Sequence, residues 1–101
     1  MTLGELIEFL EKRDPEKVVP LGFNYPHSYR GYYDQLAFEP APKIKVSEML
    51  VCTRESLGET YIGYKGGEFK MDKWTKVWLA YYGETGEEIG PTLLKYMVGE
   101  I

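Results

Sequence analysis

The chain has 101 residues and a formal net charge of −4, from 12 basic and 16 acidic side chains. This length predicts one domain, residues 1–101, with one modest core, and the acidic balance argues against duplex DNA as a partner, because DNA binding requires neutralisation of phosphates. Cys52 is the one cysteine, so an internal disulfide and a cysteine-type zinc site are excluded and a reducing cytoplasm is favoured. No apolar run is long enough to span a membrane.

Two helices are predicted from start signals and apolar spacing. Thr2 and Glu5 match a capping box, and apolar residues at helical spacing follow, so we expect a helix from about Leu3 to Arg13. Ser47 is the expected N-cap of a second helix that runs through Leu57, with Gly58 just beyond its end. The side chains expected to face inward from this second helix are Val46, Met49, Leu50 and Leu57.

The remaining segments show strand and turn patterns. Residues 24–34 are expected to form a long ordered loop or a bulged hairpin end, and residues 83–88 a solvated acidic turn. Residues 92–98 fit either a strand or a short helix opened by Pro91. Strands are expected at residues 18–23, 35–39, 60–62 and 77–81, with one more around Phe69 and Met71. The predicted fold class is α+β, with two helices packed on one face of a small, mostly antiparallel sheet.

The segment from Asn24 to Asp34 is the first candidate binding site. Four tyrosines and Arg30 fall within it. A guanidinium offers a planar fork for phosphate or carboxylate, and neighbouring rings can stack on a nucleobase. The structural alternative is that the tyrosines pack the loop onto the domain while Arg30 pairs with Asp34 or Glu39.

The second candidate is the glycine-lysine segment "GYKGG", residues 63–67. Glycines permit close backbone approach, and exposed amides can surround an anion. Lys65, Lys70, Lys73 and Lys76 outnumber Glu68 and Asp72, although the spacing is not that of a P-loop. The structural alternative is a hairpin turn with solvated lysines.

Catalysis is not predicted. His27 is the only histidine, and Cys52 lies in the second predicted helix, where a small buried hydrophobic residue is expected rather than a nucleophile. Metal binding by His27 with Asp34 and Glu39 matches no recognised ligand spacing. We therefore expect no enzyme, no cofactor and no metal.

Trp74 and Trp78 lie four residues apart, which on one strand would place both rings on the same face. We expect one ring to fill the core and the other to cover an interface between subunits. Because a small sheet leaves one face open unless a partner covers it, a homo-oligomer is expected.

The chain resembles a family of small, uncharacterised bacteriophage proteins. The resemblance is carried by the opening "TLGELIEFLEKRDPEKVV" and by segments like "SYRGYYDQLAFEP" and "GETYIGYKGGEFKMDKWTKVWLAYYGETG". It implies a phage protein in the cytoplasm of an infected bacterium, and by analogy with other small phage proteins it implies an anti-defence role.

Three functions follow as expectations. The first is a sponge that captures a phosphate-containing nucleotide immune signal without turning it over. Its expected binding residues are Tyr29, Arg30, Tyr32, Tyr33, Tyr64, Lys65, Gly66 and Gly67. The alternative is direct protein-protein inhibition of a host defence nuclease, such as a CRISPR effector, through the acidic surface and exposed tyrosines. A third expectation is a structural component of the virion.

Overall fold

Helix α1 (Leu3–Glu11) begins where its capping box predicts, in a computed structural model that describes residues 1–31, 33–63 and 65–101. The Glu5 amide donates to Thr2 Oγ1 at 3.2 Å, and the Thr2 amide donates to Glu5 Oε1 at 2.9 Å. The bond from the Thr2 amide favours the ionised carboxylate and, with a smaller contribution from the Thr2 side chain, lowers the pKa of Glu5. The helix then buries Leu3, Leu6 and Leu10.

Thr2→Ala should lower the free energy of unfolding by about 1 kcal/mol, because it leaves a helix-start amide without its acceptor. Urea denaturation measures the change. Glu8→Ala, on the exposed side of the same helix, is the control and should change stability by less than about 0.5 kcal/mol. Equal stability of the two variants would show that the cap contributes nothing.

The second helix, α2 (Val46–Ser56), starts earlier than predicted. Its N-cap is Lys45, which makes no side-chain capping bond, so the prediction that Ser47 caps it was wrong. Leu57 is 45% exposed rather than inward, because the helix ends before it, whereas Val46, Met49 and Leu50 are buried as predicted. Residues 91–97 form helix α3 (Pro91–Met97), which settles that segment as a helix.

The main sheet contains β1 (Val18–Ser28), β2 (Leu36–Lys45), β5 (Val77–Leu79) and β6 (Glu87–Glu88), in the order β1-β2-β5-β6. A separate hairpin pairs β3 (Thr60–Ile62) with β4 (Glu68–Lys70). β2 and β5 are parallel and the other pairs are antiparallel, so the sheet is mixed. With three helices beside these strands in the described part of the chain, the α+β prediction is confirmed.

Both β1 and β2 are longer than predicted. β1 continues past Asn24 through a bulge or irregularity in register between Asn24 and His27, so residues 24–28 belong to a strand, as the predicted bulged hairpin end requires, and not to a long loop. Pro40 and Pro42 do not end β2, because β5 pairs only with residues 36–38 and leaves that edge of β2 without a partner strand farther on. A proline has no amide hydrogen to donate to a neighbouring strand, and where that edge has no neighbour no hydrogen bond is lost.

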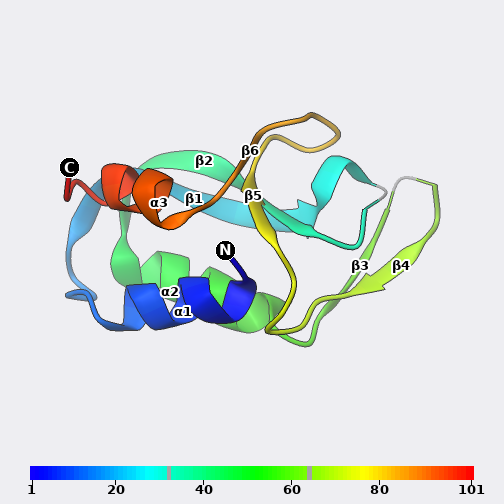
Figure 1. The fold of residues 1–101 in the computed structure, drawn as a ribbon, viewed down its shortest axis with the longest axis horizontal. Coiled ribbons are helices and arrows are strands. Elements are labelled where there is room, and N and C mark those ends of the chain that lie inside the picture. The colour runs from blue at the N-terminus through cyan, green and yellow to red at the C-terminus, as the bar shows by residue number, and fades with distance from the viewer. Residues whose placement is uncertain (32, 64) are drawn as a thin grey trace.

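The helices and strands form a layered, elongated molecule with a longest extent of 37 Å. Helix α2 packs against β1 and β2, and α1 lies beside α2 (Figure 1). The β3–β4 hairpin lies at one end of the long axis and α3 toward the other (Figure 1). Successive side chains of a strand point to opposite faces. Phe38 lies in the main core and Ala37 in a second cluster with Tyr29, Ala80 and Trp78, so the two clusters occupy opposite faces of β2.

Candidate functional site

A hollow of about 290 Å³ lies beside this second cluster. We call it the ring hollow; it is lined by Tyr29, Arg30, Tyr33, Gln35 and Trp78. Its volume is close to the lower limit of about 300 Å³ for small-molecule sites. Three of the predicted binding residues, Tyr29, Arg30 and Tyr33, therefore meet around one hollow.

The three rings of the hollow are held in a stack. The Tyr29 and Trp78 centroids are 4.1 Å apart with planes 8° from parallel, and those of Tyr29 and Tyr33 are 5.7 Å apart. The Trp78 indole donates to Gln35 Oε1 at 2.6 Å, and the Gly86 amide donates to the Tyr29 hydroxyl at 3.2 Å. Tyr29 is only 7% exposed whereas Tyr33 is 38% exposed, so Tyr29 supports the stack and Tyr33 offers it to solvent.

A tight turn places Arg30 at the rim of this stack. The 3-10 turn η1 (Tyr29–Gly31) follows β1 directly, and the Tyr29 amide donates to the Gln35 carbonyl at 2.7 Å. Arg30 has φ = 57°, a left-handed conformation that costs a non-glycine residue roughly 1–2 kcal/mol. The surrounding contacts therefore hold an arginine in a strained conformation beside the aromatic stack.

The glycine-lysine turn approaches η1 but does not line the ring hollow. A methyl group added to Gly63 would collide with the Gly31 carbonyl oxygen, so the two turns touch at their backbones. Lys65, Gly66 and Gly67 are exposed and outside the hollow, and the Gly66 amide donates to the Gly63 carbonyl at 2.8 Å. The structure thus brings the two segments together without making them one cavity. Tyr32 and Tyr64 lie outside the described residues.

A second hollow, of about 250 Å³, adjoins the first through their shared residue Gln35. We call it the tryptophan hollow; it is lined by Asp34, Gln35, Asp72, Trp74, Thr75 and Lys76. Trp74 lies in a turn, because β5 begins only at Val77, so Trp74 and Trp78 do not share one strand. Trp74 is 70% exposed whereas Trp78 is half-buried in the ring hollow.

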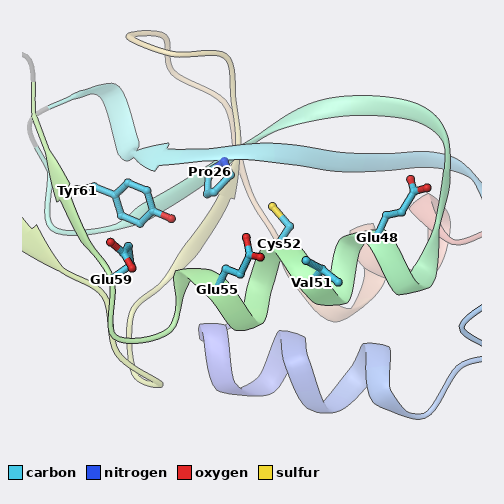
Figure 2. Close-up of a pocket in the computed structure, with 7 residues that line it drawn as sticks. All are labelled: Pro26, Glu48, Val51, Cys52, Glu55, Glu59 and Tyr61. Atoms are coloured by element: carbon cyan, nitrogen blue, oxygen red, sulfur yellow. The ribbon is translucent and has the colours of Figure 1, made fainter.

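A third pocket, on the α2 side of the sheet, has the opposite electrostatic character. It measures about 450 Å³, and Figure 2 shows α2 side chains facing Pro26 of β1 and Tyr61 of β3 across it. We call it the acidic pocket; its lining residues are Pro26, Glu48, Val51, Cys52, Glu55, Glu59 and Tyr61. Three carboxylates and no basic side chain line it, so a phosphate would be repelled there.

Cys52 in the acidic pocket is a poor nucleophile. Burial and, to a smaller degree, the nearby Glu55 carboxylate raise the pKa of its thiol to about 11. The thiolate is the reactive form, so reactivity should be low near neutral pH and rise as the pH approaches 11.

Alkylation by iodoacetamide at pH 8 should therefore be roughly a hundredfold slower for Cys52 than for a cysteine peptide with the usual pKa of about 8.5. Mass spectrometry of timed samples gives the rate, and the urea-unfolded protein is the control, in which the rate should match the peptide. A folded protein that reacts as fast as the peptide would contradict the burial of the thiol.

His27 lies in a buried position between backbone carbonyl groups. Its ring is buried, with Nδ1 2.9 Å from the Ser28 carbonyl oxygen and Nε2 3.2 Å from that of Ala80. The Nε2 contact thus joins β1 to Ala80, which follows β5, whereas the Nδ1 contact lies within β1 itself. Glu39 Oε2 lies 3.9 Å from Nε2, but within residues 1–31, 33–63 and 65–101 no three histidine, cysteine or acidic side chains gather as metal ligands.

The sequence patterns identified Tyr29, Arg30 and Tyr33 as binding residues. They did not identify Gln35 and Trp78, which line the same hollow. Trp78 was identified as part of a strand, but nothing local pairs its indole with Gln35, 43 residues away. No helix in the described part of the chain is long and apolar enough to cross a membrane. No protein-family model, curated protein or solved structure matches the chain.

Proposed function

We propose that this protein binds a phosphate-containing nucleotide in the ring hollow and holds it without turning it over. One observation carries the proposal: a fixed stack of three rings ends in the exposed Tyr33 and has Arg30 at its rim. A base stacks on an aromatic face whatever its identity, and a guanidinium binds phosphate with two parallel hydrogen bonds. The Gln35 amide nitrogen adds a donor for the edge of a base.

Two side chains support capture over turnover. The imidazole of His27 is buried with both nitrogens facing backbone carbonyls, so it is not placed as a general base at the ring hollow. The Cys52 thiol has a raised pKa and lines the acidic pocket instead. Neither group therefore stands beside a nucleotide bound on Tyr33.

In its biological setting, we propose that the chain is a phage anti-defence protein acting as a sponge for a nucleotide immune signal in the cytoplasm of the infected bacterium. The phage origin comes from the resemblance of the segments "SYRGYY" and "GYKGGEFKMD" to small phage proteins. We further propose that α1 and α2 close one face of the sheet and that copies of the chain associate.

Calorimetric titration with mononucleotides, cyclic di- and trinucleotides and ADP-ribose derivatives tests the proposal. We expect saturable binding of at least one phosphorylated compound, and chromatography of the ligand afterwards should recover it unchanged. The matching nucleoside without phosphate should bind more weakly, because it cannot engage Arg30. Absence of binding across the whole panel would refute the proposal.

A second candidate, direct inhibition of a host defence nuclease, rests on a different surface. Tyr81 and Tyr82 are 54% and 53% exposed and lead into an acidic turn, which we define as Glu84 and the following Glu87 at the start of β6, both also exposed. Tyrosines beside carboxylates can occupy a basic nucleic-acid channel. The two candidates thus use different residues, and substitutions can separate them.

A further inference from the structure

We propose that the captured ligand carries two bases, one stacked in the ring hollow and the other on Trp74 in the tryptophan hollow. This inference rests on the proposed nucleotide binding and adds the class of ligand. The two hollows have similar volumes, about 290 and 250 Å³, and meet at Gln35. Each offers an aromatic ring that solvent reaches.

Trp74 is exposed but firmly placed. Its turn is joined to the start of α1 by two backbone bonds, from the Leu3 amide to the Thr75 carbonyl at 2.7 Å and from the Gly4 amide to the Lys73 carbonyl at 3.0 Å. Its own amide donates to Asp72 Oδ1 at 2.8 Å. Because these bonds fix the backbone of the turn, only the Trp74 side chain has to be ordered when a base stacks on it, which favours binding. Lys73 Nζ lies over one face of the ring, 5.1 Å from its centroid, so the base would stack on the other face.

The spacing and the charges suit two linked nucleotides. Trp78 lines the ring hollow and lies four residues from Trp74, so their Cα atoms are at most about 14 Å apart and the two hollows lie within reach of two nucleotides joined through phosphate. Arg30 and Lys76 supply one cation to each hollow. Asp34 and Asp72 would repel a phosphate, but a carboxylate accepts a hydrogen bond from the exocyclic amino group of a base. The tryptophan hollow therefore suits an amino-bearing base such as adenine.

Calorimetry with adenosine monophosphate, linear diadenylate and cyclic diadenylate tests this inference. We expect at least one diadenylate to bind more tightly than the mononucleotide. Trp74→Ala should weaken diadenylate binding about tenfold and leave mononucleotide binding unchanged, because only the second stacking contact is lost. Trp74→Phe retains a ring and should preserve most of the affinity. Tyr96→Ala removes another exposed ring, on α3, and should have no effect.

The outcomes separate the two proposals. If the mononucleotide binds as tightly as both diadenylates, or if Trp74→Ala does not alter diadenylate binding, the two-base ligand is wrong while nucleotide capture stands. If none of the three compounds, nor any member of the wider panel, binds the wild-type protein, both proposals fall together.

Discussion

Arg30→Ala should weaken nucleotide binding roughly ten- to a hundredfold. Hydrogen bonds to a charged group contribute about 1.5–3 kcal/mol, and each 1.4 kcal/mol is about tenfold in affinity. Arg30 supplies the cation in the lining of the ring hollow, where the exposed Tyr33 would receive the base. Calorimetric titration of the wild-type and variant proteins with the best ligand of the panel measures the loss.

Arg30→Gly is the matched control. It removes the same guanidinium but fits φ = 57° without strain, so it should be more stable than Arg30→Ala by about 1 kcal/mol while binding equally poorly. Equal binding loss in two variants of different stability would separate ligand contact from folding. Wild-type affinity in both variants would show that Arg30 does not meet the ligand.

Arg30→Ala also discriminates between nucleotide capture and inhibition of a host nuclease. Under nucleotide capture, reversing the charges of Glu84 and Glu87 to lysine should be tolerated and Arg30→Ala should not. Under nuclease inhibition the order is reversed, because the acidic turn would make the contact. Glu88 is left unchanged in this test, since its carboxylate lies 3.4 Å from the N-terminal ammonium and its reversal would also remove that contact.

Gly63→Ala should destabilise the protein by about 1–3 kcal/mol, the usual cost of overpacking. The new methyl group would collide with the Gly31 carbonyl and also press on the Phe69 ring, and a backbone oxygen cannot move aside as the end of a side chain can. Thermal unfolding should show a midpoint at least about 4 °C lower. Because Gly31 closes the η1 turn that carries Arg30, nucleotide affinity should fall as well.

Gly67→Ala provides the comparison within the same turn. A methyl group there would meet only the Phe69 ring, at 3.2 Å, and a small shift of that side chain relieves it. We expect a stability change under about 1 kcal/mol. If the two alanine variants melt at the same temperature, the hairpin does not rest on Gly31 and the contact between the two turns is not structurally important.

The features that the sequence predicts well depend on neighbouring residues. The capping box at Thr2 and Glu5, the β3–β4 hairpin and the left-handed glycine after α2, Gly58 with φ = 84°, are each determined within a few residues. Ser47 fails as a cap because Val46 already lies inside the helix and is buried in the core. Core burial outweighs a capping bond of about 1 kcal/mol.

The features that the sequence does not predict depend on distant contacts. Pro40 and Pro42 follow the strand predicted at residues 35–39 and favour its end there, but pairing with β1 extends β2 to Lys45. The ring hollow needs Trp78 to reach Gln35 and Gly86 to reach the Tyr29 hydroxyl, 57 residues away. The local sequence pattern identified residues 24–34 as a candidate binding site. Their aromatic partner, Trp78, lies on β5 and could not be found from that local pattern.

Fluorescence of Trp78 gives the most direct test of nucleotide binding in the ring hollow. The chain has two tryptophans, so Trp74→Phe leaves Trp78 as the only indole. A nucleotide bound in the ring hollow should change its emission saturably, with the same dissociation constant as calorimetry, and Tyr33→Ala should abolish the response. Calorimetric binding of a nucleotide with no change in Trp78 emission would place the ligand elsewhere and contradict the proposed site.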